Sequence, residues 1–380
     1  MLTQPHHRSD RLQIATLLVT GLLLFLSGCS TPPKSSPPPN HPLPVDAKNF
    51  PLPEGVLGDD VVTMTTAGLH NHVVVRGHKS GTPGFAVIDL SINGSSWVAV
   101  SDYDAVFSPM ASERNGVLAI AFEGTVRASA LQEVGFIEWR DGKYSVDPLV
   151  PERLNSRLTG LVVVDDPFLM TASRDLPTGL QHLWRRSQGA WTEIPTPELV
   201  RFAAPASLST DLHDLFLCDD RADGSIVIHQ LTESGTVLST TTVVPAQAGL
   251  DALSLPTCLA GIDHNQYPFF AWLSFQAGTP GETAVAMWEN ASWKVHQASD
   301  AFQPVQLFSD QAQEFLFGNP WSDTSARQVL ASSGEPWHAC DMGDVVLPFG
   351  VVSQSSNMTR LAWLQNNSVV LQPLNEALHC

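Results

Sequence analysis

Cysteine is the residue type in this chain whose number and spacing point most directly to chemistry. Five cysteines occur, and Cys29 stands apart near the N-terminus. The other four form two pairs of equal spacing, because Cys218 and Cys258 lie 40 residues apart, as do Cys340 and Cys380. An even number of thiols favours disulfides in an exported chain, and the first residues of this chain indicate export, as described below. Four cysteines allow three connectivities. We expect Cys218–Cys258 and Cys340–Cys380, each of which would stabilise the fold by roughly 4 kcal/mol in the chain-entropy model.

Zinc binding is the alternative chemistry for the C-terminal cysteines. His338, Cys340, His379 and Cys380 would together supply two imidazoles and two thiolates, a set that zinc accepts in tetrahedral geometry. The spacing matches no compact zinc finger, and the thiols of an exported protein usually oxidise. Disulfides are therefore preferred, and neither a metal ligand nor a cofactor-binding residue is predicted.

Acidic turns are a second group of candidates. Residues 219–224 resemble the start of a calcium loop, but Arg221 stands where a third oxygen ligand belongs and no glutamate follows at the needed distance. A hydrated turn is the simpler interpretation, and it applies equally to Asp59-Asp60 and Asp165-Asp166. Carboxylates on such turns could still gather around the axis of a ring-shaped fold.

Histidines complete the set of candidates. His70, His72 and His78 would present imidazoles from one strand, but such residues are more often partly buried or surface-exposed than metal-binding. The sequence contains no metalloprotease helix motif, no nucleotide-binding loop and no nucleophile elbow. We therefore predict no catalytic residue.

A recurring hairpin is the element that must position all these residues. Its clearest copies are residues 135–146, 183–192 and 286–295, each an apolar strand, a tight polar turn and an aromatic that opens the return strand. A period of 40 to 50 residues is typical of four-stranded propeller blades. The residues that open the return strands are Trp97, Tyr144, Trp191, Val237, Trp293 and Trp337. Successive members of this series are 47, 47, 46, 56 and 44 residues apart. Asn-Gly, Asp-Gly and Ser-Gly turns supply the positive φ that tight hairpins need.

The fold class that follows is all-β, a β-propeller over residues 56–380. Seven four-stranded blades fit the length best, while six or eight remain open. Only three strands follow Trp337, so we expect a strand taken from residues 56–65 to complete the last sheet. The opening aromatics should pack between blades and bury about 150–250 Å² each. A carbohydrate-stacking platform is the alternative role for them.

The first 28 residues have the features of an export signal. Arg8 and Arg11 give a basic start, and residues 14–26 form a mostly apolar run that is too short to span a membrane. The run ends in Leu26-Ser27-Gly28-Cys29, which resembles the lipobox of bacterial lipoproteins. An ordinary signal peptide cut nearby is the alternative.

The resemblance to lipoproteins implies a membrane anchor. In that family the cysteine of the box receives a diacylglyceryl group and becomes the new N-terminus, so Cys29 is the predicted lipidation site. Several acyl chains on one residue would give a durable anchor. Ser30 resembles the signal for outer-membrane delivery, since aspartate at this position is the usual signal for retention in the inner membrane. The expected location is a bacterial cell envelope, at the outer membrane, on its periplasmic or its surface side.

Residues 29–55 are predicted to be a lipidated, proline-rich tether. Nine prolines lie among Ser, Asn and Lys in this stretch, and proline favours extended polyproline II. The expected organisation is therefore a signal peptide over residues 1–28, the tether over residues 29–55, and the propeller over residues 56–380.

The charge of the chain restricts its partners. It has 38 acidic and 20 basic residues, a net charge of −18. Without Arg8, Asp10 and Arg11 of the signal peptide, 37 acidic and 18 basic residues leave −19. Such a chain is poorly suited to nucleic acid, whose phosphates are bound mainly by Lys and Arg, and to adsorption on anionic lipid.

Weak resemblances to catalytic propellers cover one blade. Residues 91–97 resemble the Asp-box turn of sialidase-like propellers, with Asn93 where that motif has aspartate, and residues 88–97 resemble the repeat of quinoprotein-like propellers, which include outer-membrane assembly lipoproteins. The arginine cluster and paired carboxylates of a sialidase have no counterpart that can be placed.

The function we expect is therefore non-catalytic binding or scaffolding, with an envelope protein or a glycan as partner. The alternatives are a glycan hydrolase or lyase with two carboxylates from different blades, and a sensor of a solute or metal.

Overall fold

The computed structural model describes residues 48–64 and 71–380, with gaps of which the longest are 148–155, 174–180, 197–206 and 246–257. The predicted signal peptide, Cys29 and most of the predicted tether lie outside the described residues. Among the residues that are described, no helix has the length and apolar character that crossing a bilayer requires.

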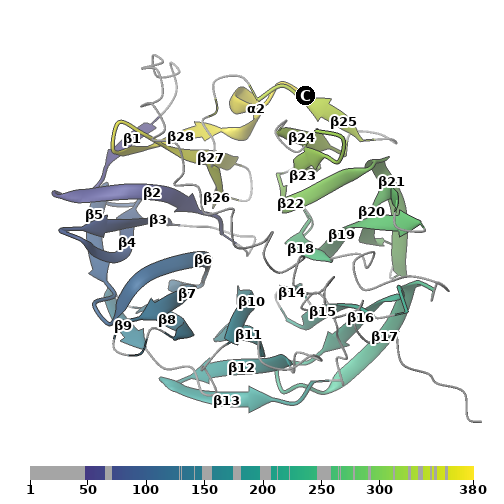
Figure 1. Cartoon of the computed structure of the whole chain (residues 1–380), viewed down its shortest axis with the longest axis horizontal. Helices are drawn as coiled ribbons and strands as arrows, with labels where there is room; N and C mark the ends of the chain where they lie inside the picture. The colour runs from purple at the N-terminus through teal and green to yellow at the C-terminus, as the bar shows by residue number, and fades with distance from the viewer. Residues whose placement is uncertain are drawn as a thin grey trace, which may run out of the picture. The chain divides into compact units, whose positions relative to one another are not determined.

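Seven four-stranded antiparallel sheets make up the described part of the chain and stand as blades around a central axis (Figure 1). The prediction of an all-β propeller with seven blades is confirmed. Blades 1 to 4 are β2 (Val56–Val62), β3 (His72–Lys79), β4 (Thr82–Asp89), β5 (Gly94–Ala99); β6 (Tyr103–Arg114), β7 (Val117–Val126), β8 (Gln132–Arg140), β9 (Lys143–Asp147); β10 (Ser156–Val163), β11 (Pro167–Ser173), β12 (Gln181–Ser187), β13 (Ala190–Ile194); and β14 (Ser207–Thr210), β15 (Leu215–Asp220), β16 (Ile226–Leu231), β17 (Val237–Val244). Blades 5 to 7 are β18 (Leu259–Ile262), β19 (Pro268–Gln276), β20 (Thr279–Glu289), β21 (Ser292–Asp300); β22 (Phe302–Ser309), β23 (Glu314–Pro320), β24 (Gln328–Ala331), β25 (His338–Cys340); and β26 (Phe349–Ser355), β27 (Met358–Gln365), β28 (Ser368–Pro373), β1 (Lys48–Pro51), and the helix α2 (Leu374–Ala377) follows β28.

The ring closes through strands from both ends of the propeller. Blade 7 has the order β1-β28-β27-β26, and β1 pairs antiparallel with β28 from Lys48 opposite Leu371 to Pro51 opposite Ser368. A closing N-terminal strand was expected, but from residues 56–65, and these instead begin blade 1 as β2. The closing strand thus lies inside the stretch predicted to be tether. Its proline is tolerated because β1 is an outer strand, where one N–H is not needed by a neighbour.

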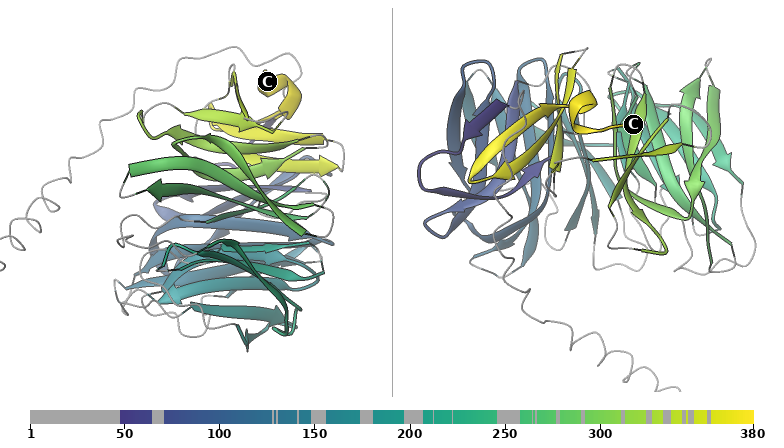
Figure 2. Two further views of the ribbon diagram at one scale, coloured as in Figure 1. Left: turned by 90° about the vertical axis from the view of Figure 1, so that its right-hand side faces the viewer. Right: turned by 90° about the horizontal axis from the view of Figure 1, so that it is seen from above.

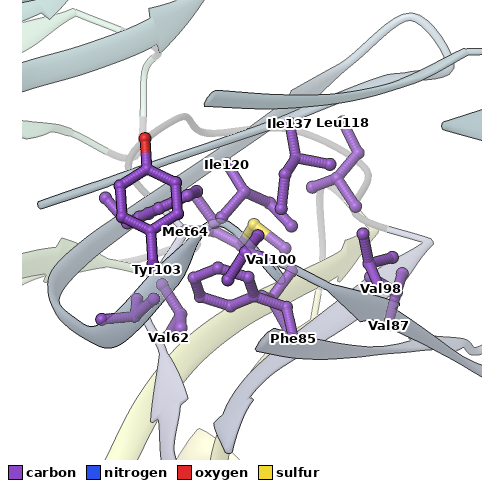
Figure 3. Packing of buried hydrophobic residues seen from close by; sticks show 14 residues of the cluster. Val62, Met64, Phe85, Val87, Val98, Val100, Tyr103, Leu118, Ile120 and Ile137 are labelled. Atoms are coloured by element: carbon purple, nitrogen blue, oxygen red, sulfur yellow. The ribbon is translucent and has the colours of Figure 1, made fainter. Parts of the chain in front are cut away.

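Apolar side chains fill the space between neighbouring blades. Figure 3 shows one such cluster, in which Val62 and Phe85 of blade 1 meet Tyr103 and Ile120 of blade 2. Four of the opening aromatics, Trp97, Trp191, Trp293 and Trp337, pack in clusters of this kind, each against the preceding blade, as predicted. The prediction is wrong for Tyr144, which is 47% exposed.

Both predicted disulfides are present. Cys218 of β15 is bonded to Cys258, which immediately precedes β18, so this bridge joins blade 4 to blade 5. Cys340 of β25 is bonded to Cys380, which fastens the C-terminal residue to blade 6. The alternative zinc site at the C-terminus loses both of its thiols to the second bridge.

The two faces of the ring differ in the connections that they carry. Figure 2 shows the strands running between these faces. On one, here called the hairpin face, first strands turn into second strands and third strands into fourth, as at Asn115-Gly116 between β6 and β7. The other, here called the connector face, carries the remaining turns and the links from one blade to the next.

Ring closure predicts a large effect of one side chain in β1. Phe50 is 7% exposed and packs on Val369 and Leu371 of β28. Phe50→Ala should lower the free energy of unfolding by about 3–5 kcal/mol, because it removes a buried ring and leaves a cavity. The neighbouring exposed Lys48→Ala should stay within about 0.5 kcal/mol of the wild type. Guanidinium denaturation measures both, and an unchanged midpoint for Phe50→Ala would contradict the role of β1.

The disulfides predict a second, paired result. Replacing Cys218 and Cys258 together by alanine, or Cys340 and Cys380 together, opens loops of the same sequence separation of 40. Each double variant should lose roughly 4 kcal/mol, since each unfolded chain regains a similar amount of entropy. Denaturation under non-reducing conditions measures the loss. The wild type under full reduction should lose more than either variant alone.

Candidate functional site

The acidic turn at residues 219–224 is closed by its own side chains. The Asp223 carboxylate accepts hydrogen bonds from the N–H and the hydroxyl of Ser225, at 2.9 and 2.6 Å. Both hydrogen bonds lower the pKa of Asp223, and the bond from the Ser225 hydroxyl has the larger effect. Arg221 pairs with Asp219 at 3.1 Å. The Asp223 and Asp219 carboxylates thus contact other residues of the turn and its edge.

The other acidic pairs take part in ion pairs. Asp60 lies 3.0 Å from a guanidinium nitrogen of Arg76, which also donates a hydrogen bond to the Val106 carbonyl in blade 2. Burial raises the pKa of Asp60, and the Arg76 charge opposes that shift. Asp166 lies 3.0 Å from Arg185. Among the described residues, no group of three His, Cys, Asp or Glu side chains has the arrangement needed to hold a metal ion.

Of the predicted histidines, His72 has the most extensive contacts, while His70 lies outside the described residues. The Nδ1 of His72 is 2.9 Å from the Glu113 carboxylate, which also accepts hydrogen bonds from the backbone N–H groups of Asn71 and His72 at 3.1 Å. Glu113 ends the innermost strand of blade 2 and is 1% exposed. One buried carboxylate therefore fixes the start of β3 in blade 1.

Aromatic rings continue the surface outward from His72. The His72 ring lies 5.8 Å from Trp139, and Trp139 is stacked on Tyr144 with 5.7 Å between ring centroids and 21° between planes. On the other side, the Nε2 of His72 is 3.9 Å from the Asp89 carboxylate. We call His72, Asp89, Trp139 and Tyr144 the aromatic platform. All four lie at strand ends on the hairpin face, across the junction of blades 1 and 2.

An arginine network adjoins this platform. Arg140, the residue after Trp139, lies 2.8 Å from Glu138 and 3.9 Å from Asp166 of blade 3. Asp166 also pairs with Arg185, which reaches Glu233 of blade 4 at 3.2 Å. Arg186 lies 2.9 Å from Glu138. The arginine network, Glu138, Arg140, Asp166, Arg185, Arg186 and Glu233, thus links blades 2, 3 and 4 on the hairpin face.

Sequence reasoning missed the grouping of these residues. The available signal was their place in the repeat, because Trp139-Arg140 and Trp184-Arg185-Arg186 end the third strands of blades 2 and 3. Equivalent strand ends in a propeller come to the same face. The pairing across blades leaves no such signal, since Arg140 and Asp166 belong to different repeats.

Stacked rings, exposed guanidinium groups and carboxylates are suited to binding. Arg140 is 44% and Arg185 is 31% exposed at the side chain, so both can still donate to a bound molecule. Glu113 accepts hydrogen bonds from two backbone N–H groups, lies 2.9 Å from the Nδ1 of His72 and is 1% exposed, so little of it is accessible to a bound molecule.

Comparison with known proteins gives distant structural likeness alone. No protein-family model and no curated protein sequence matches the chain. A prolyl endopeptidase is 16% identical over 82% of this chain with a TM-score of 0.48, and the chain spans only 46% of that protein's length. The Aleuria aurantia lectin in complex with alpha-methyl-L-fucoside is 12% identical over 76% of this chain and 96% of its own, with a TM-score of 0.42. The propeller domain of the Trilobed protease from Pyrococcus furiosus is 12% identical over 72% of this chain and 83% of its own, with a TM-score of 0.45. With TM-scores below 0.5, none of these likenesses bears on what this chain binds.

The buried carboxylate at the blade junction predicts a measurable loss of stability. Glu113→Gln keeps the size of the side chain but replaces an acceptor oxygen with an NH₂ group that faces N–H donors. The free energy of unfolding should fall by about 1–3 kcal/mol because a buried polar group is left unsatisfied. Urea denaturation provides the measurement. Glu193→Gln, at a side chain that is 52% exposed and pairs with His182, is the matched control and should change stability by less than about 1 kcal/mol.

Proposed function

We propose that this chain is a lipid-anchored protein of a bacterial cell envelope whose tethered propeller binds a partner. Leu26-Ser27-Gly28-Cys29, at the end of a short apolar run, supports the anchor. Two disulfides support export, since such bonds persist in compartments outside the reducing cytosol. The combination of the lipobox-like sequence with two disulfides is the observation that carries the proposal.

The tether is shorter in this proposal than the sequence predicted. Because β1 begins at Lys48, residues 29–47 connect the acylated cysteine to the ring. Nineteen residues of polyproline II would reach roughly 60 Å at about 3.1 Å per residue. Such a spacer would hold the propeller away from the lipid surface. Anionic headgroups would repel the cleaved chain, because its 37 acidic and 18 basic residues give it a net charge of −19.

Binding is the role of the propeller that its hairpin face supports. Trp, Tyr and Arg are the residue types that most often dominate binding energy, and the aromatic platform and arginine network bring all three together. A glycan hydrolase or lyase, the second candidate, needs two accessible carboxylates in reach of one substrate bond. Of the two carboxylates that contact His72, Glu113 is 1% and Asp89 is 27% exposed at the side chain. One accessible carboxylate of these two supports the binding role over the hydrolase.

The anchor predicts the location of a cysteine variant. Cys29→Ala should abolish metabolic labelling with a fatty acid and move the protein from the membrane fraction to the soluble fraction. Cys380→Ala is the matched control, because it also removes one thiol but should stay labelled and membrane-bound. The single variant Ser30→Asp, with Cys29 retained, should move from the outer-membrane to the inner-membrane fraction of a density gradient. Labelling of Cys29→Ala at the wild-type level would refute the anchor.

Partner binding is tested separately by cross-linking of intact cells followed by mild detergent solubilisation. A stable envelope partner should co-purify with the wild type and be lost when Arg140 and Arg185 are both replaced by alanine. A partner that persists in this double variant would place binding elsewhere on the propeller.

A further inference from the structure

We propose that the aromatic platform is a subsite for a neutral carbohydrate, with Tyr144 as the stacking surface. This inference deepens the proposed binding function and rests on it. Its starting point is the one opening aromatic that departs from the packing rule of the repeat.

In blades 1, 3, 5 and 6 the opening tryptophans contact the preceding blade and are partly or fully buried. Trp97, Trp191, Trp293 and Trp337 lie in clusters with the preceding blade, and Trp337 is only 6% exposed. In blade 2 the corresponding space is filled by Trp139 of the third strand, which packs on the cluster between blades 1 and 2. Tyr144 is thereby displaced outward and lies on top of Trp139, 47% exposed.

Because the Tyr144 ring is exposed, the protein loses the stabilisation that burial of an aromatic ring at this position would provide. Full burial of a large apolar side chain contributes about 1.5–3 kcal/mol, and sites that break a local rule of their own fold are expected to be functional. The ring is also held in place. Trp139 and Tyr144 are directly opposite across the β8–β9 hairpin, whose tight turn uses Gly142 at φ +73°. A rigid, outward-facing ring loses little entropy when a ligand stacks on it.

The neighbouring groups match the chemistry of sugar hydroxyls. The Asp89 carboxylate accepts hydrogen bonds from the N–H and hydroxyl of Ser91 through Oδ1, while Oδ2 faces His72. Burial alone would raise the pKa of Asp89, but the hydrogen bonds from Ser91 lower it, and the net shift is downward. Asp89 is therefore an ionised acceptor at neutral pH. Arg140, the residue after Trp139, has a side chain that is 44% exposed and offers donors at the end of the same strand. A sugar ring presents C–H groups to the negative face of an aromatic and hydroxyls to such acceptors and donors.

The charges around the platform select a neutral ligand. Asp89 and Glu113 are the carboxylates that contact His72 of the platform. Arg140, the residue after Trp139, already pairs with Glu138 and lies 3.9 Å from Asp166 of blade 3. The whole chain adds a net charge of −18. An acidic glycan would therefore be repelled where a neutral one is not.

A titration of the full-length lipoprotein in mild detergent tests the site. The probes are maltohexaose, cellohexaose, mannohexaose and chitohexaose as neutral glycans, and hexagalacturonate as the acidic one, followed by tryptophan fluorescence and calorimetry. We expect at least one neutral hexasaccharide to bind and hexagalacturonate not to bind. Tyr144→Ala should weaken binding about tenfold, since one stacked aromatic contact is lost, whereas Tyr144→Phe should keep it.

Tyr267 provides the matched control. It is 42% exposed, in the turn between β18 and β19 on the same face but in blade 5. Tyr267→Ala should leave glycan binding unchanged, and Tyr144→Ala should unfold at the same denaturant concentration as the wild type to within the effect of an exposed residue. The site is refuted if no neutral hexasaccharide binds, if hexagalacturonate binds more tightly, or if both tyrosine variants behave alike.

The outcome is separable from that of the proposed function. A wild type that is acylated and retains an envelope partner but binds none of the four neutral glycans overturns the platform alone. A protein that binds a neutral glycan through Tyr144 but is never acylated supports the platform and overturns the anchor.

Discussion

The four-stranded sheets of this protein are apolar on both flanks, and each flank leaves water only when a neighbouring sheet covers it. Among the described residues the buried side chains form seven clusters, and every one of them joins two adjacent blades. None is confined to a single blade. The sheets therefore stabilise one another around the ring, and the final contact, between blade 7 and blade 1, depends on the strand β1 that the N-terminal side supplies.

This mutual burial explains which features could be predicted from sequence. The period of the opening aromatics follows from it, because each blade must present a similar flank at a similar place. The period and the chain length together favoured seven blades and left six or eight open. Disulfides with equal separations of 40 residues follow as well, since that interval is close to one blade. The strand β1 could not be found in this way. It is four residues long and lies among prolines, and its pairing with β28 joins residues more than 300 positions apart.

The candidate site was only partly predictable, for the same physical reason. His72 attracted notice as a polar residue in a strand, but its partner Glu113 lies 41 residues away at the end of the next blade's innermost strand. Contacts of this kind arise where two repeats meet and have no local pattern. Tyr144 was recognised as a member of the repeat, yet its exposure depends on Trp139, which occupies the junction in its place. Whether a residue at a given position of the repeat is buried therefore depends on its neighbours as well as on that position.

Rigid binding surfaces follow from the closure of the ring. The platform residues belong to four strand ends that are fixed by a buried carboxylate, by a cross-strand aromatic pair and by the cluster between blades 1 and 2. A partner that binds there meets side chains that are already ordered, so little of the binding energy is lost to ordering them. If the chain before Lys48 is the tether proposed above, the freedom to reach a partner would reside there.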